Sequence, residues 1–341
     1  MFCTVAKYST GPIVSMFFYM FVQLINTYFI GHTNDSALIA GVGMGNMLIN
    51  VLAFAIMQGL NGALETLISQ ASGASQDMKK SPEFRKRQRI QCGILHNRGR
   101  FVVTCVMVPI IVIFACSETL LIAMGQDAKV SYTAKRYVCM MIPGVWSMGQ
   151  FDSTKKFLSS QYKNSIPVWT QVLTTIIHWI LCKILISNMG MRADGAAIAT
   201  NITYILNMII ADTCIRMKKD TWFPDMVFFY DMTVFNEVGK FLKIGIPGML
   251  MLCFEWWAFE LLALFTGLLG VDQLAAEVVI INMISFIFML PLGISYTASA
   301  LTGNYIGKGN IDLAKRFARM AVVFDILCTT VIVILLLIFQ E

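Results

Sequence analysis

Nine apolar segments of roughly 20 residues run through the sequence, and that length crosses the hydrocarbon core of a bilayer. They lie near 11–31, 36–58, 101–124, 133–158, 166–188, 194–215, 244–269, 273–300 and 318–339. Of the 341 residues, 57% are hydrophobic and 13% are charged, whereas a soluble domain carries about a quarter charged residues. So little charge cannot cover a water-facing surface. The sequence therefore predicts an all-α, polytopic bundle of transmembrane helices.

The basic residues lie almost entirely on one side of the predicted spans. If the N-terminus faces the cytoplasm, the inner loops hold 21 of the 26 lysines and arginines, eight of them between Lys79 and Arg100. Short cytoplasmic loops of membrane proteins are enriched in lysine and arginine. The pattern predicts a cytoplasmic N-terminus, with 79–100 as a solvated inner loop and the three basic residues of 155–163 in another inner loop.

The seventh and eighth spans repeat features of the first and second. Pro12 and Pro247 each begin a span and lie 235 residues apart. At an offset of 234, Gly59, Gln70 and Gly73 correspond to Gly293, Asn304 and Gly307. Six spans separate the copies, and an even number gives both copies the same orientation about an axis along the membrane normal.

This repeat predicts a two-lobe molecule whose second lobe is incomplete in the given sequence. We expect an N-lobe over 1–220 with helices one to six, a cytoplasmic linker over 221–243, and a partial C-lobe over 244–341 with helices seven to nine. Since the second copy has only three helices, we expect a twelve-helix protein whose last three spans lie outside this sequence.

Several motifs, in order, resemble those of the multidrug and toxic compound extrusion (MATE) transporters, particularly the eukaryotic branch. The segment NGALETLISQASG over 61–73 is similar to that family's second helix, and 140–161, ending in FLSSQ, to its fourth. The segment GAAIAT over 195–200 resembles the start of its sixth. The most specific stretch covers 241–309 and includes FLKIGIPGMLMLCFEWW and LPLGISYTASALTGNYIGKG. The resemblance covers nearly the whole chain.

The resemblance implies an antiporter that exports organic cations or other xenobiotics in exchange for protons or, in some bacterial members, sodium. It places the essential glutamate of the family's seventh helix at Glu255. Asn26 stands where prokaryotic relatives have an aspartate, which implies that this N-lobe position does not titrate here. The family's further acidic residues in the tenth helix would fall beyond Glu341.

Glu255 is also singled out by its chemistry. A carboxylate in the middle of a span costs about 2.5–3.5 kcal/mol on insertion scales, so we expect it to be buried with a partner, a water or a proton. A proton and a cationic solute compete for one carboxylate, which can couple their movements. The alternative is a structural carboxyl bonded within its lobe.

Three further polar residues are candidates for proton or substrate binding. Glu260 lies five residues after Glu255, about 140° around an ideal helix, so the two share a cavity only if the helix is kinked. Asn282 in the eighth span can hydrogen-bond across its lobe, and Asp152 is the mid-span carboxylate of the N-lobe. Each has a structural alternative. Glu65 lies near a helix end, where a carboxylate needs no special role.

A cation-binding cavity needs polar groups and aromatic faces. Neutral amides can line a wet cavity within the membrane, and aromatic rings attract cations. The candidates are Asn26, Gln58, Asn61, Trp256 and Tyr296. Packing against lipid or core is the alternative for the two aromatic residues.

The sequence offers no pattern for enzymatic chemistry. His32, His96 and His178 stand apart without ligands at helical spacing, so we expect no metal site. No phosphate-binding loop or nucleophile motif occurs. We therefore expect a non-enzyme with no cofactor beyond its coupling ion, proton or sodium, and no nucleic-acid partner. We expect a monomer in the lipid bilayer of a plasma, vacuolar or lysosomal membrane.

Two alternatives stay open beside export of organic cations. One is a flippase for lipids or lipid-linked sugars with the same broad architecture. The other is an inactive truncated transporter or a receptor-like helical bundle. The sequence leaves the substrate, the coupling ion and the membrane undetermined.

Overall fold

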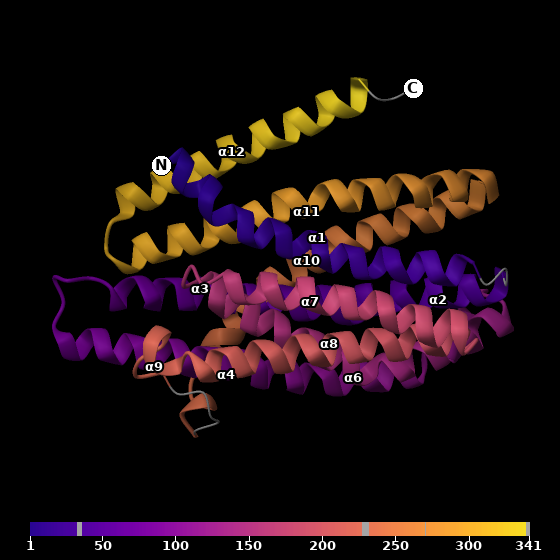
Figure 1. Ribbon diagram of the computed structural model, residues 1–341, viewed down its shortest axis with the longest axis horizontal. Coiled ribbons are helices and arrows are strands. Elements are labelled where there is room, and N and C mark those ends of the chain that lie inside the picture. The colour runs from indigo at the N-terminus through magenta and orange to yellow at the C-terminus, as the bar shows by residue number, and fades with distance from the viewer. Residues whose placement is uncertain (33–35, 227–231, 270, 339–341) are drawn as a thin grey trace.

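The computed structural model describes residues 1–32, 36–226, 232–269 and 271–338. Within these ranges the side chains of 36–37, 232, 260–261, 263–279, 281–282 and 335–336 are outside the description. The described residues form nine long helical segments and no strand, as predicted for an all-α bundle. Figure 1 shows most segments side by side along one direction, with α12 outermost at one edge.

A π-helical turn, η1, joins α2 to α3 without a break, and a second one, η2, extends α7. The first part of the chain contains α1 (Phe2–Gly31), α2 (Ser36–Ile49), η1 (Asn50–Phe54), α3 (Ala55–Ser75), α4 (Pro82–Ala115), α5 (Ser117–Ala123), α6 (Ala128–Ser159), α7 (Ser165–Cys182), η2 (Lys183–Asn188) and α8 (Arg192–Met217). The short α9 (Lys219–Trp222) and η3 (Met232–Val234) precede α10 (Val238–Leu269), α11 (Val271–Gly307) and α12 (Ile311–Ile338). Because η1 joins α2 to α3, the second predicted span continues well beyond residue 58.

Local sequence explains where α4 and α6 begin. Ser81 caps α4 by accepting a hydrogen bond from the backbone N–H of Phe84 at 3.2 Å. Pro82 follows in the first turn, where its missing N–H leaves no helical bond unmade. Asp127 caps α6 by accepting from two backbone N–H groups of its first turn. These oxygens satisfy donors that have no partner inside the helix.

The early start of α4 corrects the prediction of a solvated loop over 79–100. Most of this segment is helical, and Arg98 is buried, donating to the backbone oxygen of Val234 at 3.1 Å. Arg100 forms a 2.7 Å ion pair with Asp212 of α8. The two arginines nearest the apolar part of α4 therefore bind other segments of the chain, η3 and α8.

The predicted inner loop over 155–163 is likewise partly wrong. Helix α6 continues to Ser159, and the side chains of Lys155 and Lys156 are only 11% and 4% exposed. Asp152, one turn earlier in α6, and the backbone oxygen of Gln58 in α3 make this burial possible, because buried charges require pairing.

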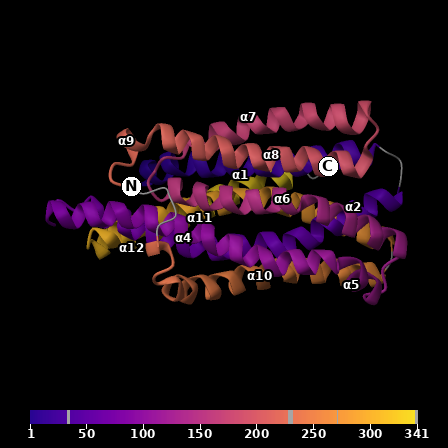
Figure 2. The same ribbon diagram turned by 90° about the horizontal axis from the view of Figure 1, so that it is seen from below.

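Eight of the nine long helices in the described ranges are long and apolar enough to cross a membrane. The exception is α6, which packs against α2, α4 and α8 and carries many buried polar side chains. Figure 2 shows α6 between α8 and α4. A helix enclosed by other helices can hold polar groups that find partners there. The bundle is thus apolar outside and partly polar inside.

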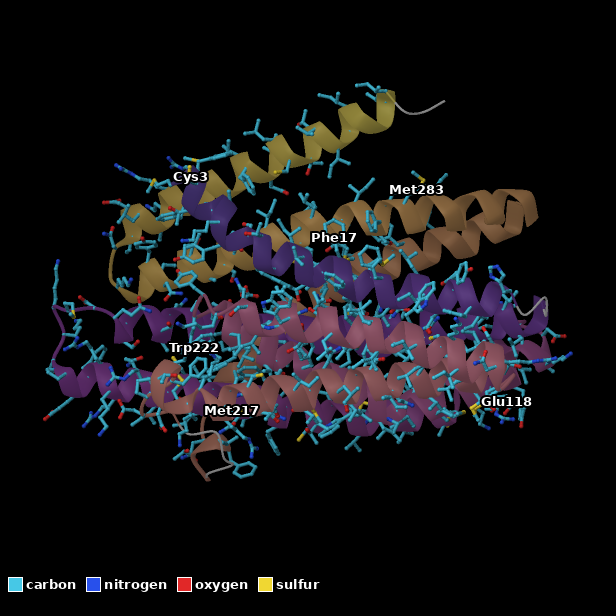
Figure 3. All side chains as sticks on the ribbon, viewed as in Figure 1. Cys3, Phe17, Glu118, Met217, Trp222 and Met283 are labelled. Atoms are coloured by element: carbon cyan, nitrogen blue, oxygen red, sulfur yellow. The ribbon has the colours of Figure 1, made fainter. Side chains whose placement is uncertain are left out.

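The basic loops gather at one end of the bundle, which we call the basic end and define by the α3–α4 turn with Lys79 and Lys80. Figure 1 shows the N-terminus, this turn, α9 and the α11–α12 turn at its left-hand end. In Figure 3, Cys3 and Trp222 lie toward that end and Glu118 lies at the opposite one. This arrangement agrees with the charge pattern that predicts a cytoplasmic N-terminus.

Candidate functional site

The two repeat copies touch along α3 and α11 near the basic end. A Cβ on Gly73 would collide with the backbone of Asn304, and a Cβ on Gly307 with the backbone of Gln70. The offset of 234 relates Gln70 to Asn304 and Gly73 to Gly307, so the two contacts are one contact made twice. Such reciprocity is characteristic of a two-fold interface. It agrees with a parallel repeat about an axis along the bundle.

The same relation continues toward the middle of the bundle. Gly59 of α3 lies against the backbone of Met249 in α10, while its repeat partner Gly293 in α11 lies against Ile13 of α1. Helices α1 and α10 therefore occupy equivalent places on the two sides of the interface. Glycine at these positions lets the copies pack backbone to backbone, which closes the interface at the basic end.

A buried charged cluster lies beside this interface. Asp152 of α6 accepts a hydrogen bond from Asn61 Nδ2 at 2.9 Å. Its carboxylate oxygens lie 3.3 Å from Lys155 Nζ and 4.0 Å from Lys156 Nζ. Ser153 donates to the amide oxygen of Asn61 at 2.9 Å, so the amide is held in one orientation. The predicted site residues Asp152 and Asn61 are thus brought together, with two lysines as partners.

Tyr296 of α11 joins the cluster from the other repeat copy. Its ring centroid lies 5.1 Å from Lys156 Nζ and 5.7 Å from Lys155 Nζ. Gln58 donates its side-chain amide to the tyrosine hydroxyl, and Lys156 donates to the backbone oxygen of Gln58 at 2.9 Å. The aromatic face predicted to receive a cationic solute therefore already faces two lysines. Cavities of about 10 and 20 Å³ adjoin the cluster.

Asn26 belongs to a separate buried network in the first copy. Its amide donates to Thr200 Oγ1 at 2.9 Å, and its oxygen lies 3.2 Å from His178 Nε2. The other ring nitrogen of His178 lies 2.9 Å from Thr203 Oγ1. These contacts link α1, α7 and α8, and Asn26 is 2% exposed. In this conformation Asn26 packs between helices and lines no open cavity.

The prediction that Glu255 is buried is wrong for this structure, because its side chain is exposed. Helix α10 packs on α3 through Gly245 and Met249. Glu255 follows Met251 and Phe254 on another face, where those two side chains are 71% and 64% exposed. No described helix covers this face. Residues 251, 254 and 255 share it because positions three and four apart lie on one side of a helix.

Two tryptophans next to Glu255 fix the rotation of α10. Trp257 donates its indole N–H to the backbone oxygen of Val51 at 3.2 Å. The ring of Trp256 lies 5.2 Å from that of Phe54, so this predicted cavity residue is half-buried against η1. Together they hold Glu255 on the uncovered face. The side chains of Glu260 and Asn282 lie outside the described residues.

Sequence reasoning missed three members of the charged cluster: Glu65, Lys155 and Lys156. Glu65 is 4% exposed and lies in the middle of α3, so the expectation that it lies near a helix end is wrong. Helical spacing could have found the lysines, since residues 152, 155 and 156 lie on one face of a helix. The charge pattern counts them among the basic residues of an inner loop, although they lie at the end of the predicted span 133–158.

Comparison with known proteins gives a consistent family match. A family model described as MatE matches residues 12–184 and 247–341. The chain is 30% identical over 319 residues to Protein DETOXIFICATION 16 of Arabidopsis thaliana, covering 92% of this chain and 62% of the relative. It is 29% identical over 318 residues to Multidrug and toxin extrusion protein 1 of Xenopus tropicalis, covering 92% and 52%. The chain thus spans between about half and two thirds of these relatives.

Solved structures show the same fold. The crystal structure of the eukaryotic MATE transporter AtDTX14 is similar with a TM-score of 0.82 at 26% identity, covering 95% of this chain and 69% of that one. A Vibrio cholerae MATE transporter matches in fold with a TM-score of 0.83 at 18% identity, covering 99% and 73%.

Proposed function

Because this chain belongs to the MATE family of integral membrane transporters, we propose that it moves organic cations out of the cytoplasm in exchange for protons, with Glu255 as the coupling carboxylate. The names of its relatives, multidrug and toxin extrusion proteins among them, support a xenobiotic substrate. The family consists of transporters, so the proposal is one of transport and not of catalysis.

The observation that carries the proposal is the position of Glu255. It lies near the middle of the 32-residue α10, as the one charged residue of the apolar stretch from Ile244 to Phe259. A carboxylate in the middle of a span is costly to leave ionised and alone, so it favours binding a proton or a cation. The two compete, because each neutralises the same charge. If the two repeat copies rock about their shared interface, the carboxylate is exposed to each side in turn.

Transport in vesicles tests the proposal. The purified chain is reconstituted into liposomes with an acidic lumen, and uptake of a radiolabelled quaternary ammonium is measured together with proton efflux by a pH-sensitive dye. We expect acid-driven uptake by the parent, and uptake at the level of empty vesicles for Glu255→Gln. The matched control is Glu118→Gln, which removes a carboxylate that pairs with Lys135 at the opposite end from the basic end. It should transport like the parent.

Each other outcome has a defined meaning. Equal uptake by the parent and Glu255→Gln contradicts the assigned role of Glu255. Uptake driven by a sodium gradient at constant pH would show that sodium, and not the proton, is the coupling ion. Movement of a fluorescent lipid headgroup without cation uptake would favour a flippase and contradict the proposal.

A further inference from the structure

The buried carboxyl of Glu65 has no part in the proposed exchange at Glu255. It lies on α3 where α3, α6 and α11 meet, and its side chain is shielded from solvent. One of its oxygens, Oε1, is buried without a hydrogen-bond partner. Ser299 of α11, in the other repeat copy, lies next to the carboxyl. The group therefore lies directly on the interface between the copies.

The contacts around Glu65 join α3 to α11, so a separation of these two helices would uncover the carboxyl. Along α3, Gln58 contacts Tyr296, Glu65 contacts Ser299 and Ser69 contacts Gly303. The three α11 residues are spaced by three and four positions, so they form one stripe that faces α3. Any movement that opens the basic end must pull this stripe away and admit water to Glu65.

The charged groups that face Glu65 all come from α6. They are Lys155, Lys156 and Asp152. On α4, His96 contacts Thr154 and Arg100 pairs with Asp212, so both are engaged elsewhere. Helices α10 and α11 present no charge to Glu65 among the described residues.

We propose that Glu65 is a second proton-binding carboxyl, which holds a proton while α3 and α11 are closed and releases it at the basic end when they separate. An ionised carboxylate with an unpartnered oxygen is poorly solvated in the closed interface. Water that enters on opening supplies the missing hydrogen bonds. The O–H bond of the carboxyl breaks on opening and the proton passes to water, with no other reactant. The inference deepens the proposed function and rests on it.

The closed state should therefore lose stability as pH rises. A single proton that binds only the closed form changes the ratio of closed to open molecules by at most about tenfold per pH unit. Spin labels at Met78→Cys and Ile311→Cys, which are 82% and 58% exposed, report the separation of the basic ends of α3 and α12. The six exposed or half-buried native cysteines are first replaced by serine: Cys3, Cys105, Cys116, Cys139, Cys214 and Cys328.

We expect the distance distribution of the parent to shift from short to long as pH rises, and that of Glu65→Gln to stay short at every pH. Glu65→Asp keeps a titratable group and should keep the shift. Glu118→Gln is the surface control and should also keep it. The labels need no transported substrate, so this result does not depend on the uptake assay.

Three outcomes overturn the proposal: an unchanged pH response in Glu65→Gln, loss of the response in Glu65→Asp, or no response in the parent. If Glu65→Gln does not fold, Ser299→Ala provides a second test, because it removes the partner on α11 and should move the transition to a different pH. An unaltered transition in that variant contradicts the proposal. Loss of uptake in Glu255→Gln combined with an intact response in Glu65→Gln would leave the proposed function standing and remove only this inference.

Discussion

At the scale of single residues, a charged side chain of this protein is buried where it has charged or hydrogen-bonding partners. Asp152 lies between two lysines and an amide, whereas Glu255 lies on an uncovered helix face. Both are acidic residues within predicted membrane spans, so their sequence context is similar. Taking a carboxylate out of water is costly unless it is paired and hydrogen-bonded. The pairing of Asp152 favours a structural role beside the proton-binding role proposed from sequence.

This pairing gives a stability prediction. Asp152→Ala leaves Lys155 and Lys156 without their acidic partner, and we expect a loss of about 3–5 kcal/mol, the usual cost of breaking a buried pair from one side. The measurement is thermal unfolding of the purified protein in detergent, followed by tryptophan fluorescence.

The double variant Asp152→Asn with Lys155→Met serves as the control, because it removes one charge of each sign. It should recover part of the lost stability. Equal stability of parent and Asp152→Ala would show that the cluster contributes no net pairing energy.

Among the helices, glycine determines how closely α3 and α11 approach. Gly73 and Gly307 face the backbone of the opposite helix, where a side chain cannot be accommodated by a change of rotamer. A methyl group on Gly62, in the same α3, would meet no atom within 4 Å. Gly73 and Gly62, both on α3, therefore have different roles, because Gly73 allows close contact with α11 and Gly62 faces open space.

The difference between Gly307 and Gly62 predicts opposite effects of substitution by alanine at the two positions. Gly307→Ala should lower stability by about 1–3 kcal/mol, as overpacking does in a close-packed core. It should also shift the spin-label distance between α3 and α12 toward the open form. Gly62→Ala should stabilise α3 by about 0.5–1 kcal/mol, because alanine loses less backbone entropy in a helix. Similar unfolding temperatures for the two variants would contradict the close contact.

Across the molecule as a whole, the interface between repeat copies organises the bundle. Helix α3 of the first copy packs against α10 and α11 of the second, and α1 packs against α11. Phe17 of α1, labelled in Figure 3, lies with its ring 5.0 Å from that of Phe286 in α11. These contacts join the two repeat copies along the bundle, and the glycine contacts between α3 and α11 close its basic end.

The charge distribution predicts the orientation of the molecule. We expect Met78→Cys, at the basic end, to react with a membrane-impermeant maleimide only from the cytoplasmic side. Met189→Cys, which is 61% exposed after η2, should react only from the other side. The background lacks the exposed Cys3, Cys105 and Cys116. Labelling of both sites from one side would contradict the predicted topology.

Local and periodic features of the amino-acid sequence are sufficient to give the class of fold, whereas the family is indicated by motifs such as those over 61–73 and 241–309. Apolar length, the placement of lysine and arginine, and the 234-residue offset can each be read without coordinates, because they depend on residue type and spacing alone. The predicted helix starts are less accurate. Residues 82–100 are predicted as a loop because hydropathy does not separate a polar helix from a polar loop.

Which polar groups meet depends instead on how the helices pack in three dimensions. Glu65 and Ser299, or Lys156 and Tyr296, are far apart in the chain and come together because glycine contacts set the register of α3 on α11. The exposure of Glu255 likewise follows from the rotation of α10, which Trp257 fixes through its bond to Val51. Hydropathy gives the length of a helix and leaves its rotation and register to side-chain packing between helices.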